Sequence, residues 1–397
     1  MIILLGLFTT GLVFPQTSND TVSFTRDKCI QIALENHLEM KNAIMDEKIA
    51  KAEVLSAWDI PATDFRLERG QINYEQIDNH FSFLQSFGNI AQQIAQTSYN
   101  KQRLHLMKIY TRKKEAEITW QVSALYDEMT AALQKRKLLN REKQMLDELK
   151  RITQLAYDAG VSEYVDLLSI TMSSQLLERR LMDLEASYAE LASQLKTYLN
   201  IQTACKPLND TLAPMRLPDD NVFPDSTQTL MIKPYYQTLL LSKKQLQTQR
   251  SAFWPGISAG YFNQQLEHVN GFQGFFVGLS IPILSFKNYT AVRVASLNKM
   301  KAENELSFQT QKLRNDIYAL YQKIKKSEER ISSYTSRSLP EAENLVKQAQ
   351  VQYKTGVIDF QNFYFFFNQA MQVQYAYIDE CLLHNQLVLA YSYLTAK

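Results

Sequence analysis

One stretch occurs twice in this chain, as Tyr157-Asp-Ala-Gly-Val-Ser-Glu-Tyr-Val-Asp-Leu-Leu168 and as Tyr353-Lys-Thr-Gly-Val-Ile-Asp-Phe-Gln-Asn-Phe-Tyr364. In each copy a single glycine, Gly160 or Gly356, interrupts a long helical pattern that resumes within a few residues. Glycine takes a left-handed backbone conformation without steric cost, so a lone glycine after helix-forming residues marks a helix end. Each copy therefore predicts the tight turn of a long helical hairpin.

The sequence on both sides of the two turns also repeats. Tyr164 and Phe360 stand at the same distance after their glycines, and so do Asp183 and Asp379. Two unrelated hairpins that share a turn would not match in this way, and we interpret the chain as an internal duplication. The first repeat is predicted to cover 17–205 and the second 229–397. Four prolines between 206 and 228 mark the linker that joins them.

The composition excludes several classes of protein. Only 11 Gly and 10 Pro occur in 397 residues, which favours very long helices, and the formal net charge of +2 leaves no basic patch for nucleic acid. Cys29, Cys205 and Cys381 are far apart, so we expect no structural metal site. The chain lacks a phosphate-binding loop, a nucleophile elbow and a dinucleotide fingerprint. We therefore predict no catalytic residue, no metal, no cofactor and no enzyme.

The first 16 residues are apolar and precede a polar segment. The run is too short for a mature transmembrane helix and is typical of a signal peptide, with a buried N-terminal strand as the alternative. No later stretch approaches the roughly 18 apolar residues that a transmembrane helix needs.

Each repeat contains one region in which apolar and polar residues alternate, at about 62–88 and about 256–284. Alternation with period two predicts strands, and two alternating runs around a polar loop predict a β-hairpin. The apolar candidates for an outward face are Phe81, Phe83, Phe87, Phe275, Val277, Leu279, Ile281 and Ile283, and the candidates for an aromatic belt are Tyr261, Phe262 and Phe286.

Each repeat is thus predicted to contain a helix, a β-hairpin, a long helix, a turn and a returning helix. The first helix is expected to run from Phe24 to Trp58, and Pro340 is expected to kink the helix over 289–353. The fold is mostly α with a small β part. Four strands leave open edges and cannot close a barrel, whereas two copies would supply eight strands and three copies twelve.

The order of elements, the stretch Gly278-Leu-Ser-Ile-Pro-Ile-Leu-Ser-Phe286 and the two Tyr-x-x-Gly-Val turns resemble the TolC outer-membrane efflux family. The resemblance covers nearly everything after residue 22. One departure is Lys287-Asn-Tyr-Thr-Ala-Val-Arg293, which keeps only the arginine of the Gly-Gly-x-Arg segment often found there.

This resemblance implies a homotrimer in the cell outer membrane. Its twelve-stranded transmembrane β-barrel would contact outer-membrane lipid and continue into a helical α-barrel in the periplasm. The trimer would be the exit duct of a tripartite pump for drugs, metal ions or other small molecules, with a periplasmic adaptor (a membrane fusion protein) and an inner-membrane transporter as partners.

The resemblance also implies two sets of functional residues. The adaptor would meet the two turns at Ala159, Gly160, Val161, Thr355, Gly356 and Val357. Family members often narrow the duct with acidic residues six and nine positions after the second glycine, where this chain has Asn362 and Phe365; the first repeat has Asp166 at six. The aromatic run 363–367 could form an apolar constriction that gates by dewetting, or it could pack between helices.

Two other functions remain open at this point. A non-conducting coiled-coil scaffold would explain the helical seams but not two aromatic hairpins at matching places. An exit duct of a type I protein or peptide secretion system would share the channel architecture.

Overall fold

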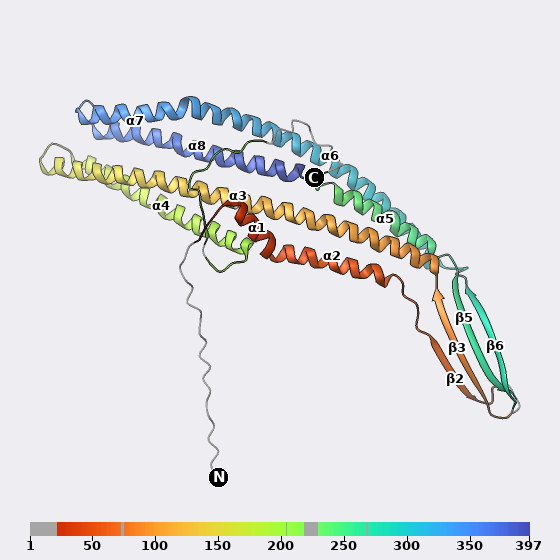
Figure 1. Cartoon of the computed structure of the whole chain (residues 1–397). Helices are drawn as coiled ribbons and strands as arrows, with labels where there is room; N and C mark the ends of the chain where they lie inside the picture. Colours follow the sequence, from red (N-terminus) through yellow and green to blue (C-terminus); the bar gives the residue numbers. More distant parts are fainter. Residues whose placement is uncertain (1–21, 73–74, 204, 218–228, 267–268) are drawn as a thin grey trace, which may run out of the picture. The chain divides into compact units, whose positions relative to one another are not determined.

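The structure is a computed structural model that describes residues 22–72, 75–203, 205–217, 229–266 and 269–397 (Figure 1). The predicted signal peptide at 1–16 and the later part of the linker, 218–228, lie outside the described residues. The described residues are mostly helical with few strands, which confirms the prediction of a mostly α fold with a small β part.

The elements of the first repeat are β1 (Val22–Phe24), α1 (Arg26–Asn36), α2 (Leu38–Ser56), β2 (Asp64–Gly70), β3 (Asp78–Gly88), α3 (Ile90–Asp158) and α4 (Tyr164–Leu199). The linker and the second repeat contain β4 (Cys205–Pro207), α5 (Lys233–Ser251), β5 (Gly256–Leu266), β6 (Val269–Ser280), α6 (Phe286–Ser333), the π-helical η2 (Tyr334–Ser338), α7 (Leu339–Lys354) and α8 (Phe360–Thr395).

These elements form two compact units, and each unit takes segments from both repeats. The first unit contains 1–37, 118–216 and 324–389, and the second contains 38–117, 217–323 and 390–397. The helices α3, α6 and α8 contribute residues to both units.

The prediction of one helix from Phe24 to Trp58 is wrong. Phe24 belongs to β1, and Thr25 caps α1 by accepting a hydrogen bond from the Lys28 amide to its Oγ1 at 3.3 Å. At His37 the backbone becomes extended, with φ −59° and ψ 129°, and α2 begins at the next residue. Neither glycine nor proline marks this break, so the sequence pattern does not reveal it.

The prediction of four strands is also incomplete. In the first unit β1 pairs in parallel with β4, with Val22 opposite Cys205. Both strands have only three residues, too few for a period-two pattern.

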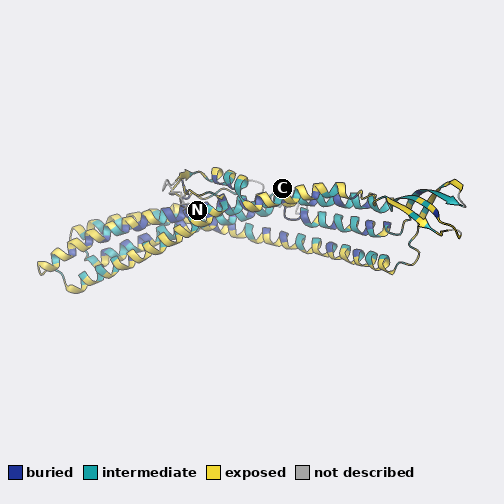
Figure 2. Ribbon diagram, turned by 90° about the horizontal axis from the view of Figure 1, so that it is seen from below, coloured by how far each residue is buried: buried dark blue, intermediate teal, exposed yellow. Residues whose placement is uncertain are grey.

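Core side chains of the first unit form stripes along its helices, which Figure 2 shows as dark blue segments on their inner sides. Leu139 and Leu146 on α3 pack with Leu177 on α4. The spacing of seven between the first two residues is that of a helix packed along its length.

Pro340 interrupts the long helix of the second repeat in an unexpected way. The chain passes from α6 into five residues of π-helix and then into α7, and Pro340 lies in the first turn of α7. Because the backbone is helical on both sides of Pro340, its missing N–H removes a hydrogen bond to the preceding turn. The π-helical segment just before it takes up the change in hydrogen-bonding pattern.

In the second unit the two hairpins form one antiparallel sheet of order β2-β3-β5-β6 (Figure 1). The hairpins of the two repeats join where β3 pairs with β5, for example with Phe83 opposite Tyr261. β6 ends at Ser280, so Ile281 and Ile283, which we predicted as strand residues, lie after it. Pro282 between them has no N–H to donate to a ladder.

Candidate functional site

Both predicted turns have the same backbone geometry. Gly160 has φ +71°, its N–H donates to the Tyr157 carbonyl at 2.9 Å, and the Val161 N–H donates to the Ala156 carbonyl at 2.8 Å. These are the two hydrogen bonds of a Schellman motif, which ends a helix with a left-handed residue.

The second turn repeats this arrangement. Gly356 has φ +72°, its N–H donates to the Tyr353 carbonyl at 3.1 Å, and the Val357 N–H donates to the Gln352 carbonyl at 2.9 Å. The local reason for each turn is therefore a glycine at the one position that needs a left-handed backbone.

The surface of both turns is open. A Cβ added to Gly160 or Gly356 would meet no heavy atom within 4 Å. The residue after the glycine in a Schellman motif often packs against the helix, but here Val161 is 83% exposed and Val357 is 71% exposed. All six residues predicted at the turns are exposed: Ala159, Gly160, Val161, Thr355, Gly356 and Val357.

The predicted gate residues lie just beyond these turns. The carboxylate of Asp166 accepts hydrogen bonds from Ser162 Oγ at 3.0 Å and from Gln361 Nε2 at 2.9 Å. The second bond joins the start of α4 to the start of α8, and hence the two repeats. The backbone N–H of Asn362 donates to Asp359 Oδ1 at 2.8 Å, which caps α8.

The aromatic run 363–367 separates into buried and exposed rings. Phe363 is 1% exposed and Phe367 is 4% exposed, and both pack with Leu149 of α3 and Ala349 of α7. Phe365 points elsewhere and is 61% exposed. Helical spacing thus places Phe363 and Phe367 in the core of the protomer and leaves Phe365 exposed.

A buried carboxyl group in the same unit was not predicted. Glu142 on α3 is 2% exposed and accepts a hydrogen bond from the Tyr375 hydroxyl at 3.1 Å. Burial raises the pKa of Glu142, against the opposing effects of that hydrogen bond and of Arg180. The sequence did contain a signal, because Glu142 interrupts the apolar series that includes Leu139 and Leu146.

The four-stranded sheet has one apolar face. Directly opposed residues of antiparallel strands point to the same side, so the registers place these side chains together: Phe65, Leu67, Phe81, Phe83, Ile257, Ala259, Tyr261, Phe275, Val277 and Leu279. The same face also carries Arg69, Asn79, Asn263 and Gln273 toward the hairpin loops, and Gln85 toward the helices. Several are largely exposed, with Phe275 at 85% and Val277 at 76%. The sheet therefore presents an uncovered apolar surface.

The opposite face is mainly polar. It carries Asp64, Arg66, Glu68, Asp78, His80, Ser82, Ser86, Ser258, Gln264 and Ser280, together with Leu84, Phe262, Phe272, Phe276 and five glycines. Phe262, predicted beside Tyr261 as a belt residue, belongs to this face, because successive strand residues point to opposite sides. Phe286, also predicted for the belt, begins α6.

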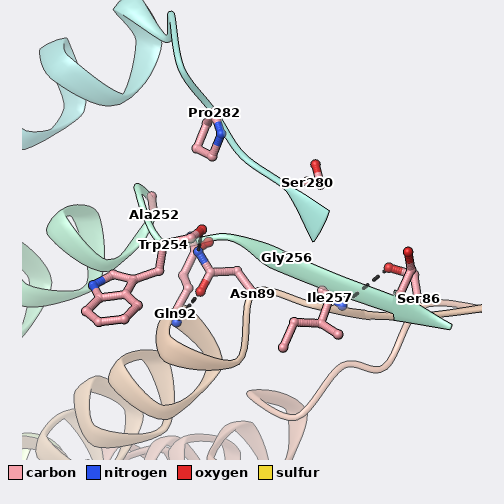
Figure 3. A pocket seen from close by; sticks show the side chains of 11 residues that line it. Ser86, Asn89, Gln92, Ala252, Trp254, Gly256, Ile257, Ser280 and Pro282 are labelled. Atoms are coloured by element: carbon pink, nitrogen blue, oxygen red, sulfur yellow. Dashed lines mark hydrogen bonds between the residues drawn. The ribbon is translucent and has the colours of Figure 1, made fainter. Parts of the chain in front are cut away.

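A pocket of about 310 Å³ lies at the base of the sheet, between the end of β6 and the starts of β5 and α3 (Figure 3). Asn89 in its wall donates through Nδ2 to the carbonyls of Ser251 at 2.8 Å and Trp254 at 2.7 Å. Its Oδ1 accepts the Gln92 N–H at 2.9 Å and so caps α3. Asn89 thus joins the end of α5 and the segment before β5 to the start of α3.

Within the described ranges, no three His, Cys, Asp or Glu side chains are grouped so that they could hold a metal ion. No helix among those residues is both apolar and long enough to span a membrane.

No family model and no curated protein matches the chain in sequence. Solved structures do match it in fold. Against CusC, whose description refers to transmembrane channel formation, the TM-score is 0.79 at 13% identity, covering 99% of each chain. Against the CmeC outer membrane channel of Campylobacter jejuni it is 0.77 at 12% identity, covering 100% of this chain and 93% of that one.

The open state of the MtrE outer membrane channel of Neisseria gonorrhoeae matches with a TM-score of 0.74 at 14% identity, covering 100% of this chain and 98% of the other. These likenesses extend over the whole chain. The chain therefore has the fold of these outer-membrane channels. This is the fold implied by its resemblance to the TolC family.

Proposed function

We propose that the protein is the outer-membrane channel component of a tripartite efflux pump and acts there as a passive exit duct. The observation that carries this proposal is the two-faced sheet. An uncovered apolar face suits lipid, and a polar opposite face suits a water-filled lumen, which is the alternation of transmembrane β-barrels. A soluble coiled-coil scaffold would have no use for such a sheet.

The sheet needs further copies to close. β2 and β6 are its edges, and no other strand pairs with them among the described residues. With four antiparallel strands, β6 of one copy and β2 of the next also run antiparallel, so copies can join without a break in the pattern. Three copies give a barrel of twelve strands, the number that the family resemblance implies.

The helices support the same assembly. Val165, Leu168, Met172 and Leu176 form a stripe on α4, spaced by three and four residues, and each is between 45% and 58% exposed. Covering such a stripe by another copy of the chain would remove apolar surface from water at about 25 cal/mol per Å². A homotrimer would thus extend from the barrel into a helical duct in the periplasm.

The turns are proposed as the docking surface for the periplasmic adaptor. Val161 and Val357 expose small apolar side chains next to bare glycine backbone, and a neighbouring chain can pack closely there. Energy for transport of drugs, metal ions or other small molecules would come from the inner-membrane transporter.

We place the gate of the duct beside these turns. The Asp166–Gln361 hydrogen bond would hold the two repeats of one protomer together, and the exposed Phe365 and Asn362 would face the narrowing. An apolar ring from each of three copies would form a constriction that excludes water.

The first test is the oligomeric state and location of the protein. Membranes would be fractionated, and the detergent extract would be run on gels with and without boiling. We expect a heat-sensitive trimer from the outer membrane. A soluble monomer or dimer would refute the proposal.

A second test addresses the two faces of the sheet. Phe275→Cys and Phe276→Cys place a thiol on adjacent residues of one strand, while the native Cys29, Cys205 and Cys381 are buried. A membrane-impermeant maleimide should label Phe276→Cys from the lumen and leave Phe275→Cys unlabelled. Equal labelling of both would contradict a lipid-facing apolar side.

A further inference from the structure

We infer that the inner wall of this barrel carries a weak binding surface for organic cations that contain an aromatic ring. The inference rests on the proposed duct and names the substrate class for which its wall is suited. Three phenylalanines supply the surface, Phe262 on β5 and Phe272 and Phe276 on β6, all on the polar face of the sheet.

Two of these rings lie against the wall because each faces a glycine. Phe276 is opposite Gly260 and Phe262 is opposite Gly274. A Cβ on Gly260 would lie 2.2 Å from Cζ of Phe276, and a Cβ on Gly274 would lie 2.8 Å from Cζ of Phe262. The rings thus occupy the space that a side chain would take on the neighbouring strand.

This arrangement leaves the faces of the rings available. Phe276 is 40% exposed and Phe272 is 44% exposed. In the proposed barrel both rings would face the lumen. The imidazole of His80 lies next to Phe262, with ring centroids 6.2 Å apart, and extends the aromatic surface onto β3. A ring that lies flat on the wall can stack with a passing solute without closing the duct.

Charged side chains on the same face determine whether a positively or a negatively charged solute is favoured. Asp64, Arg66 and Glu68 follow one another on the polar side of β2, and Arg66 lies 3.6 Å from the Asp64 carboxylate and 3.7 Å from that of Glu68. Two carboxylates against one guanidinium leave the polar face of β2 net negative, whereas Arg69 of the same strand lies on the other face. The β2 strand is two strands from β5, or about 10 Å.

A net negative group of side chains beside exposed aromatic faces fits a cation that carries an aromatic ring. The rings attract the positive charge through their quadrupoles, and the net negative charge on this face of β2 raises the local cation concentration. In a barrel of three copies the aromatic and acidic strips would alternate three times around the lumen. At exposed sites each ring adds about twofold to fivefold in affinity, which is weak enough for release.

The test uses trimers in planar bilayers, with current block as the readout. The probes are benzyltrimethylammonium, tetramethylammonium and benzenesulfonate, added on the side of the β-barrel. We expect benzyltrimethylammonium to block at concentrations several times lower than either of the other two. Phe262→Leu with Phe276→Leu should weaken that block by about threefold to tenfold.

The matched control is Phe275→Leu, the same change at the adjacent residue on the apolar face. It should leave the block unchanged. Conducting channels that the three probes block equally, or whose block the inner-face double variant does not alter, would overturn the inference and leave the duct intact. Assembled trimers that carry no current even with Phe365→Ala, which removes the proposed constriction, would refute the duct and this inference together.

A second variant tests the position of the ring. In Gly274→Ala the new methyl displaces the Phe262 ring, which is a movable side chain, away from the wall. We expect the open-channel conductance to fall while aromatic preference persists. An unchanged conductance would show that the ring does not lie at the lumen and would count against the inference.

Discussion

Replacing the two turn glycines by asparagine separates a docking role from a purely structural one. Gly160 and Gly356 have φ of +71° and +72°, a region that asparagine enters more readily than most other residues. A Cβ at either position meets no atom within 4 Å. The double variant Gly160→Asn with Gly356→Asn should therefore keep both turns and add a polar side chain to each exposed surface.

The expected cost to folding is small. An alanine in the left-handed region costs about 1–2 kcal/mol, and asparagine costs less. The open space around both glycines adds no steric term. By comparison, truncating one buried phenylalanine of the same unit costs about 3–5 kcal/mol. We therefore expect trimers at wild-type abundance in unboiled samples.

Docking should respond differently from folding. If the adaptor packs on bare backbone at the turns, the added side chains should weaken association at least tenfold, or about 1.4 kcal/mol. The assay is efflux of a fluorescent dye in cells, together with photo-cross-linking from Val351, which lies on α7 one turn before Gly356 and is 58% exposed. The cross-linked partner would be identified by mass spectrometry.

Each outcome has a defined meaning. Normal trimers with lost efflux and lost adaptor cross-links support docking at the turns. Normal trimers with full efflux and full cross-linking refute it and leave the glycines with the turn alone. A matched pair, Gly160→Val with Gly356→Val, should damage folding instead, because a β-branched residue tolerates positive φ poorly.

Three further predictions follow from single side chains. Phe363→Ala should destabilise the protomer by about 3–5 kcal/mol and lower the melting temperature of the trimer, whereas Phe365→Ala should change it little, because the first ring is 1% and the second 61% exposed; equal shifts would contradict the assignment. Glu142→Gln should keep an acceptor for the Tyr375 hydroxyl. Because burial raises the pKa of Glu142, ionisation of this carboxyl destabilises the wild-type fold as the pH rises above the ordinary carboxyl range, so the variant should become more stable relative to wild type with rising pH. Thermal unfolding across that pH range measures the difference, and a gain in stability confined to acid pH would contradict the prediction. Gly260→Ala should prevent trimers from forming, because its Cβ would lie 2.8 Å from a backbone carbonyl oxygen of β3; normal trimers on unboiled gels would refute that close packing.

Most of the architecture follows from patterns in the sequence. The turn glycines end long helices at the residues where the structure ends them, and period-two alternation locates both hairpins. These signals are local, because a left-handed glycine and an alternating strand depend mainly on neighbouring residues. The resemblance of the fold to the TolC family, which the structural comparisons confirm, rests on the same two features in duplicate.

The structural features that could not be predicted from the sequence depend mainly on contacts between distant segments. The pairing of β1 with β4 joins residues nearly a whole repeat apart, and the break at His37 has no glycine or proline to mark it. The register between β3 and β5, which joins the two hairpins into one sheet, could not be predicted either. A shift by one residue exchanges the two faces of a strand, so a pattern alone does not fix them.

The two hairpin tips share a backbone but not their side chains. Asp166 stands six residues after the first glycine, and Asn362 takes the same place after the second. The carboxylate of Asp166 accepts a hydrogen bond from Gln361 of the other hairpin, and the position of Gln361 is held by Val165 in the first. A carboxylate in place of the Gln361 amide would put like charges together, with no donor between them. The hydrogen bond that joins the two tips therefore depends on side chains that the two copies of the turn do not share.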